Sequence, residues 1–340
     1  MKNIQKIKVA LVLALCLPLV LTSCKKDDTP AATGSRDGGF LVVNEGGFGK
    51  GNATLGYVNT NNEYEDAVFE TENDRKLGDI FQSFLESDEY YFMSVNNSAK
   101  IEILNKSTLK STGTLENLGS PRYMVEAGGK VWVQDLFAAK LTYFDIASPT
   151  STSTLTLNAA ASSITSTGAF VHLVVNGKLV SVDSKAIQQS SDSMDYGLKL
   201  VMATSNSNNE IYALGKGGSD SLFGLKINST NMELVSKVFI EVNTSWLSAF
   251  NYSAVNGAFS FYDKNTIYSI STETFDKIDK IATPLEATYV YSYSVHPITG
   301  DFYITDAKDF VQSGEVFHTS NTGEVLNKIQ VGINPNACHF

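Results

Sequence analysis

The feature that most constrains the fold of this chain is a unit of four short strand-like segments that recurs along it. The unit is clearest at 120–157, SPRYMVEAGGKVWVQDLFAAKLTYFDIASPTSTSTLTL. Alternating apolar and polar residues predict strands at 121–126, 130–135, 140–146 and 152–157. Turn residues, including Gly128, Gly129 and Pro149, separate them. One such sheet cannot bury both of its apolar faces, so further copies must stack against it.

Further copies are present at a regular interval. Comparable first-strand segments begin at Gly78, Ala161, Leu200, Ser245 and Thr288. Second-strand and third-strand segments follow each of them, which gives six complete units between Gly78 and about Gly332. The spacing of about 42 residues is typical of propeller blades, whereas helical repeats have periods of roughly 33–34 residues.

The two ends of the chain supply a seventh unit. Residues 334–340, NPNACHF, resemble a first strand, and residues 40–69 supply the later strands as FLVVN, ATLGYVN and EDAVFE. Pairing these ends closes a ring and removes exposed sheet edges. We therefore predict an all-β, seven-bladed propeller over 39–340, closed by N- and C-terminal strands that share one blade. Six or eight blades are alternatives, and a pair of β-sandwiches would not explain the regular spacing.

The first residues have the pattern of a lipoprotein export signal. In 1–23, three lysines precede an apolar run that is too short to span a membrane. The sequence LTSC ending at Cys24 resembles the bacterial lipobox, in which cleavage precedes a cysteine that receives the lipid. An ordinary secretory signal is the alternative. Residues 24–38 read as a lipid-anchored flexible linker, whose Asp27 and Asp28 resemble a surface-export signal or form a hydrophilic tether. We expect a protein at the cell surface of the outer membrane, attached only through its lipid.

Charge and cysteine content exclude some classes of partner. The net charge of −10 becomes about −13 once the lysine-bearing leader is removed. Nucleic acids require clustered Lys and Arg, so we expect no nucleic-acid partner. Cys338 is then the remaining unmodified cysteine, and we expect it inside the closing strand as a small apolar residue.

We find no convincing catalytic or metal-binding pattern in the sequence. The histidines His172, His296, His318 and His339 do not have metal-ligand spacing, and we interpret each as a strand or turn residue. No nucleophile elbow or phosphate loop occurs. The sequence therefore predicts neither a metal nor a cofactor. A propeller can still assemble a site from distant residues, and His339 and Glu45 are the candidates for such a site.

Candidate ligand-binding residues follow from the geometry of a propeller blade. The loops between strands 2 and 3, and those joining strand 4 to the next blade, surround one mouth of the central channel. Aromatic, amide and charged side chains gather at these positions and suit a large, flat ligand with a polar rim. The candidates are Asn44, Glu45, Phe48, Gln82, Asn96, Asn97, Arg122, Tyr123, Asp135, Phe137, Trp246, Tyr262, Asp306 and Phe310. The wider set includes Tyr291, Asp263, Lys216 and Lys264. Alternatively, the aromatics fill inter-blade cores and the asparagines form turns.

Four segments in the first third of the chain resemble a known family. They are 44–49 (NEGGFG), 77–83 (LGDIFQS), 95–102 (VNNSAKIE) and 120–123 (SPRY). They are similar to the YncE-like and DUF5074 group of seven-bladed propeller lipoproteins, which includes the BtuG-type cobalamin-capture proteins. From about Ala161 onward only the blade rhythm is shared. The resemblance implies a non-enzymatic binder that captures cobalamin or another corrinoid, as ligand and not cofactor, for a TonB-dependent transporter. The alternatives are a propeller lyase or hydrolase acting on a lactone or glycan, and a protein-binding scaffold.

Overall fold

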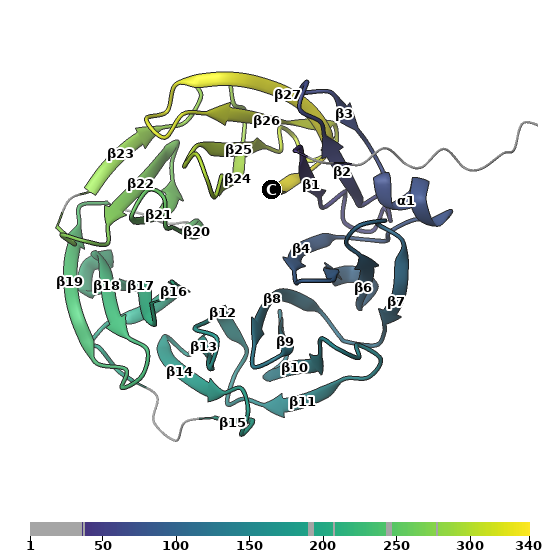
Figure 1. Cartoon of the computed structure of the whole chain (residues 1–340). Helices are drawn as coiled ribbons and strands as arrows, with labels where there is room; N and C mark the ends of the chain where they lie inside the picture. Colours follow the sequence, from purple (N-terminus) through teal and green to yellow (C-terminus); the bar gives the residue numbers. More distant parts are fainter. Residues whose placement is uncertain (1–35, 37, 190–193, 207, 243–246, 277) are drawn as a thin grey trace, which may run out of the picture. The chain divides into compact units, whose positions relative to one another are not determined.

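Seven four-stranded antiparallel sheets surround a central axis in the computed structural model (Figure 1). The structure describes residues 36, 38–189, 194–206, 208–242, 247–276 and 278–340, and one compact unit spans Arg36–Phe340. The predicted all-β fold with seven blades is confirmed, and the alternatives of six blades, eight blades or paired sandwiches are not found.

We number the blades along the chain and name each one's strands from the channel outward. Blade 1 consists of β28 (Pro335–His339), β1 (Phe40–Asn44), β2 (Thr54–Val58) and β3 (Tyr64–Glu65). Blade 2 consists of β4 (Phe81–Glu86), β5 (Tyr90–Val95), β6 (Lys100–Asn105) and β7 (Ser111–Leu115). Blade 3 consists of β8 (Pro121–Ala127), β9 (Lys130–Asp135), β10 (Lys140–Asp145) and β11 (Ser153–Thr156). Blade 4 consists of β12 (Ala161–Ser166), β13 (Phe170–Val175), β14 (Lys178–Asp183) and β15 (Gln188–Gln189).

The remaining three blades follow the same order. Blade 5 consists of β16 (Lys199–Ser205), β17 (Glu210–Lys216), β18 (Leu222–Asn228) and β19 (Leu234–Ile240). Blade 6 consists of β20 (Ser248–Ser253), β21 (Ala258–Asp263), β22 (Thr266–Ser271) and β23 (Ile278–Ala282). Blade 7 consists of β24 (Val290–Val295), β25 (Phe302–Asp306), β26 (Ser313–Thr319) and β27 (Val325–Ile333). Short 3-10 turns, η1 (Asn96–Ser98) and η2 (Gly218–Asp220), follow β5 and β17.

The ends of the ring meet in blade 1, as the sequence predicts. β28 pairs antiparallel with β1, with Leu41 opposite His339 and Val42 opposite Cys338. The rings of Phe40 and Phe340 lie 5.7 Å apart between their centroids. Cys338 is buried in this closing strand, and the strand position predicted for it is confirmed. Closure pairs the inner edge of β1, which would otherwise be an open template for another chain.

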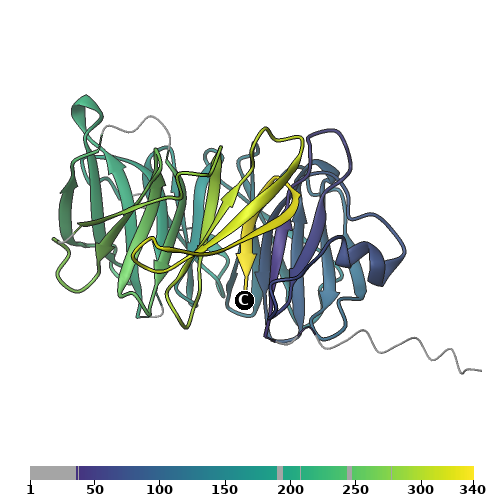
Figure 2. The same ribbon diagram turned by 90° about the horizontal axis from the view of Figure 1, so that it is seen from above.

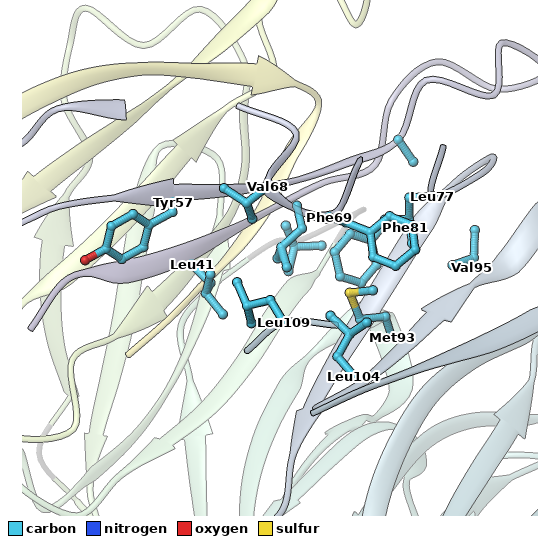
Figure 3. Close-up of a cluster of buried hydrophobic side chains, with 13 residues drawn as sticks. Leu41, Tyr57, Val68, Phe69, Leu77, Phe81, Met93, Val95, Leu104 and Leu109 are labelled. Atoms are coloured by element: carbon cyan, nitrogen blue, oxygen red, sulfur yellow. The ribbon is translucent and has the colours of Figure 1, made fainter. Parts of the chain in front are cut away.

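The outermost part of blade 1 differs from the prediction. The segment EDAVFE is not a strand: β3 ends at Glu65, and the helix α1 (Val68–Asn73) follows. Ala67 has φ of 53°, a left-handed conformation that ends the extended chain before the helix. Val68, Phe69 and Glu72 are buried, a spacing that places them on one helical face. Figure 3 shows Val68 and Phe69 among the buried side chains of β1, β4 and β5, so the helix fills the space between blades 1 and 2.

Apolar clusters between neighbouring blades form the core of the ring. One of them joins blades 3 and 4 through Trp132, Leu141, Val171 and Leu173. Each blade buries its two faces against its neighbours, which allows one ring to exceed the size of a single-core domain. In the described part of the chain, no helix has the length and apolar character needed to cross a membrane.

The two faces of the ring carry different loops. Each first strand runs away from one face, which also bears the loops between second and third strands; we call it the mouth face. The C-terminus lies at the opposite face, the lower one in Figure 2. Because β1 is antiparallel to β28, β1 begins at Phe40 on that opposite face and ends at Asn44 on the mouth face. The chain that precedes Phe40 therefore joins the ring away from the mouth.

Candidate functional site

A cavity of about 980 Å³ lies within the channel. Residues of the innermost strands of all seven blades line it, together with Glu45 and loop residues of the mouth face. Its size lies at the upper end of the range of small-molecule sites in proteins.

A bulge in every first strand shapes the cavity wall. In each blade the register between the first and second strands shifts near the mouth. A bulge adds an unpaired residue and redirects its side chain. The bulged residues all line the cavity: Asn336, Gln82, Arg122 with Tyr123, Ser162, Val201, Ala249 and Tyr291, in blades 1 to 7.

The bulged residues make the wall asymmetric. Blades 7, 1, 2 and 3, which are consecutive around the ring, contribute Tyr291, Asn336, Gln82 and Arg122. We call these four residues the polar arc. Blades 4, 5 and 6 contribute only small or apolar side chains at the same position. At the bulged positions, the wall therefore has long polar side chains on blades 7 to 3 and small side chains on blades 4 to 6, which leaves space for a ligand beside the latter.

Glu45 is the residue on which side chains of the polar arc converge. It directly follows β1, and its buried carboxylate accepts hydrogen bonds from three blades. Gln82 Nε2 donates to Oε1 at 2.9 Å, Asn336 Nδ2 donates to Oε1 at 2.8 Å, and Tyr291 OH donates to Oε2 at 2.9 Å. The backbone N–H of Glu45 donates to Asn334 O at 2.9 Å, which ties the residue to the closing segment.

The environment of Glu45 makes its carboxyl titrate near neutrality. Burial raises the pKa of Glu45 to about 7, although hydrogen bonds from Tyr291 and Gln82 and the charge of Arg122 act in the opposite direction. Burial and the nearby Glu45 charge raise the pKa of Tyr291, so its hydroxyl remains a proton donor. A half-ionised carboxyl facing a cavity is a candidate functional group.

Arg122 ends the polar arc. Its guanidinium lies over the ring of Tyr123, with 4.9 Å from Cζ to the centroid. Its backbone carbonyl accepts a hydrogen bond from Ser83 Oγ of the neighbouring blade. Its Nε is buried and has no hydrogen-bond partner within the described residues. The side chain is thus positioned at the cavity with a donor left unused.

Further polar residues reach the cavity from blades 5 to 7. Lys216, Asp263 and Lys264 line it from the ends of second strands and the following loops. Tyr262 OH donates to Asn265 Oδ1 at 3.2 Å. Tyr289 contacts Phe310 edge to face, 4.8 Å between centroids, so aromatic side chains border this part of the mouth.

The structure brings together five of the fourteen candidate residues. Glu45, Gln82, Arg122, Tyr123 and Tyr262 line the cavity. The ring of Phe310 lies outside this lining, 5.8 Å between centroids from Tyr291. Phe48 and Phe137 lie on exposed loops of the mouth face, each 78% exposed. Trp246 lies outside the described residues.

The remaining five candidates hydrogen-bond to the protein itself. Asn44 is fully buried and donates to Thr54 and Tyr64. Asn96 donates to Pro121 O, and Asn97 donates to Asp79. The carboxylates of Asp135 and Asp306 accept backbone N–H groups of nearby loops. These side chains occupy the loops predicted for them but do not line the cavity.

Sequence reasoning missed Asn336, although residues 334–340 were correctly predicted to form a first strand. Asn336 occupies the same bulged position as Gln82 and Tyr291. In six of the seven inner strands the bulged position directly follows the first residue, and β16 is the exception with Val201 as its third residue. This shared position becomes clear only when the bulges are known.

The predicted strand and turn positions of the four histidines are confirmed. His172, His318 and His339 lie in β13, β26 and β28, and His296 lies in the turn after β24. Throughout the described ranges, no three or more His, Cys, Asp or Glu side chains gather as a metal site would require. His339 lines the cavity and hydrogen-bonds to Glu86 at 2.6 Å.

Solved structures with the same fold confirm the propeller, and their names indicate different functions. A quinonprotein alcohol dehydrogenase-like protein from Bacteroides thetaiotaomicron is 13% identical, with TM-score 0.69, covering 89% of this chain and 78% of the other. A putative 6-phosphogluconolactonase from Bacteroides fragilis is 12% identical, with TM-score 0.64 and coverages of 89% and 98%. Apo AztD from Citrobacter koseri is 10% identical, with TM-score 0.62 and coverages of 88% and 96%. No protein-family model and no curated protein matches the sequence. At these identities the similarity establishes the propeller fold.

Proposed function

We propose that this propeller is a lipid-anchored protein of the outer cell surface that captures a small-molecule nutrient without changing it chemically. The observation that carries the proposal is the one-sided arrangement of bulged residues around the cavity, in which side chains of three consecutive blades converge on Glu45. A closed ring holds these side chains in place before a ligand arrives, which keeps the entropic cost of binding low. The bound nutrient would then pass to a TonB-dependent transporter.

A corrinoid such as cobalamin is the first ligand to test. The family resemblance of the first third of the sequence suggests it, and the polar arc offers amide and hydroxyl groups at one wall of the cavity. Amide groups on the rim of a flat macrocycle would find partners there, while Tyr123 and Tyr289 provide aromatic contact area.

Calorimetric titration of the chain from Lys25 onward with cyanocobalamin tests this ligand. We expect one site per chain, with affinity lowered about tenfold or more in Gln82→Ala, because that change removes a cavity amide. Phe137→Ala, in an exposed loop outside the cavity lining, is the matched control and should bind as the unmodified chain does. No binding at micromolar protein would exclude corrinoids as the ligand.

The membrane anchor is tested separately. The LTSC sequence supports lipidation at Cys24. We expect the full-length chain in the membrane fraction of a lipoprotein-exporting bacterium, accessible to protease added outside intact cells. Cys24→Ala should release it. Equal membrane association of both chains would contradict the lipid anchor.

A lyase or hydrolase acting on a lactone or glycan is the second candidate function. The hydrogen bond between Glu45 and Tyr291 favours it, because a carboxyl with a pKa of about 7 can act as a general acid or base. Hydrolysis of glucono-δ-lactone by the unmodified chain, lost in Glu45→Gln, would support an enzyme. Equal rates with both chains would count against Glu45 as a catalytic residue.

A further inference from the structure

The three arginines of the chain differ in one respect. Arg36 forms ion pairs with Glu65 and Glu72, and Arg75 forms one with Glu102. Arg122 has no carboxylate within ion-pair distance among the described residues, and this absence is what distinguishes it. The buried Nε atoms of Arg122 and Arg36 both lack a hydrogen-bond partner within the described residues. A guanidinium without a carboxylate partner can offer its Nη groups to a ligand oxyanion.

Arg122 is held with its side chain in the wall of the cavity. The bulge of β8 places Arg122 and Tyr123 opposite Gln134, and both lie in the cavity wall. Contact with the Tyr123 ring and the hydrogen bond from Ser83 to the Arg122 carbonyl restrict its position. A guanidinium held in this way loses little freedom when it binds an oxyanion through two parallel hydrogen bonds.

The charges around the cavity also favour an anion. Arg122, Lys216 and Lys264 line it, against Glu45 and Asp263, whereas the whole chain has a net charge of −10. The cavity is thus more positive than the remainder of an acidic protein. Such a local excess attracts anions into a low-dielectric cleft.

We propose that Arg122 binds an oxyanion, a carboxylate or a phosphate, of a small molecule whose apolar part faces Ser162, Val201 and Ala249, the bulged residues of blades 4 to 6. The inference rests on the proposed function of this cavity as a ligand site, and it names the chemical group that the ligand must carry. Arg122 is then the residue that selects anionic over neutral ligands.

The arginine Nε–H signals in a nitrogen-15 correlation spectrum test this directly, because three arginines give three such signals. Inorganic phosphate and acetate are titrated separately into the chain from Lys25 onward. We expect a saturable shift of the Arg122 signal with at least one of them, and the stronger of the two identifies phosphate or carboxylate. The ion-paired Arg36 and Arg75 are internal controls. Absence of an Arg122 shift with both anions, or equal shifts of all three signals, would overturn the inference.

Arg122→Gln and Arg122→Lys identify the Arg122 signal by its loss from the spectrum. The lysine variant keeps the positive charge and serves if the glutamine variant does not fold.

A corrinoid comparison separates this inference from the proposed function. Cyanocobalamin carries a phosphodiester that dicyanocobinamide lacks, so we expect the latter to bind about 10-fold to 100-fold more weakly, a difference that Arg122→Gln abolishes. Failure of both corrinoids to bind, with an anion-dependent Arg122 shift, rejects the corrinoid and retains the anion site. If all variants bind cyanocobalamin equally and the Arg122 signal does not shift with either anion, the anion site is rejected and the corrinoid ligand is retained.

Discussion

At the scale of single residues, Glu45 is the most heavily constrained group of the cavity. Its carboxylate accepts hydrogen bonds from Gln82, Asn336 and Tyr291, which come from three different blades. Nevertheless its burial raises its pKa to about 7, from an ordinary value of 4.5. Because the folded state favours the protonated form, ionisation of Glu45 opposes folding at higher pH.

We expect Glu45→Gln to stabilise the fold at alkaline pH. Between about pH 4.5 and about pH 7 the unfolded chain has released this proton while the folded chain retains it, so the free energy of unfolding falls as pH rises. The rise of the pKa from 4.5 to about 7 corresponds to about 3 kcal/mol in the free energy of unfolding, which Glu45→Gln should recover at about pH 8. Urea unfolding at several pH values measures it. The exposed Glu116→Gln is the control, and an equal gain in both variants would contradict the prediction.

Anion binding should also depend on the protonation of Glu45. Arg122 is the cation facing Glu45, Tyr291 keeps its proton, and Gln82 and Asn336 do not titrate. Protonation of Glu45 removes a negative charge from beside the proposed anion site. The affinity for sulfate, whose charge is constant here, should therefore rise several-fold as pH falls from about 8 to about 6. The Arg122 Nε–H signal reports it. Glu45→Gln should bind sulfate equally at both pH values. If the affinity of this variant depends on pH as strongly as that of the unmodified chain, Glu45 is not the group coupled to anion binding.

At the scale of elements, the second strands of blades 3 and 7 end in aspartates that accept backbone N–H groups from the loops of the mouth face. Asp306 follows this pattern in blade 7. It is fully buried and accepts backbone N–H groups from Thr288 and Tyr289 at 2.9 and 2.8 Å, and from Lys308 at 2.9 Å. One carboxylate therefore joins the loop that enters the blade to the loop within it.

Asp306→Ala should destabilise the fold markedly. It leaves three backbone donors without their acceptor, and the expected loss is about 3 kcal/mol. Asp309→Ala is the matched control in the same loop: Asp309 accepts the N–H groups of Val311 and Gln312 in an exposed turn. Thermal unfolding of both variants measures the difference. A midpoint unchanged by Asp306→Ala would show that these hydrogen bonds contribute little.

At the scale of the whole molecule, the ring depends on the pairing of β28 with β1, two strands far apart in the sequence. β28 pairs with β1 and places Cys338 and Phe340 against Phe40 and Tyr303. It also supplies Asn336 to the polar arc. Ring closure and the site thus share one element, β28. β1 begins at Phe40 on the face opposite the mouth, and the predicted anchor precedes it in the sequence.

Deletion of residues 334–340 should abolish the closed ring. The inner edge of β1 would be unpaired and the apolar cluster exposed, so we expect broad unfolding and self-association. Calorimetry and size-exclusion chromatography detect both. Phe340→Ala keeps the strand pairing, and we expect it to remain monomeric and to lose about 2 kcal/mol. A sharp transition and a monomeric deletion variant would indicate that closure is dispensable.

Much of the fold could be predicted because strands are encoded locally. The strands predicted at 121–126 and 130–135 agree closely with β8 and β9, and the closing role of 334–340 is confirmed. The helix α1 was mispredicted, because Val68 and Phe69 fit either period and only the left-handed Ala67 ends the strand.

The site was less accessible to sequence reasoning. Asp135 is the last residue of one second strand and Glu45 directly follows another. The carboxylate of Asp135 nevertheless accepts backbone N–H groups, while that of Glu45 accepts hydrogen bonds from side chains of three blades. The sequence by itself determined the alternation, the repeat and the pairing of the ends, since these depend on neighbouring residues and on the burial of two-faced sheets. Only the tertiary structure decided which polar side chains reach the cavity, because that depends on one extra residue in each inner strand and on groups brought together by ring closure.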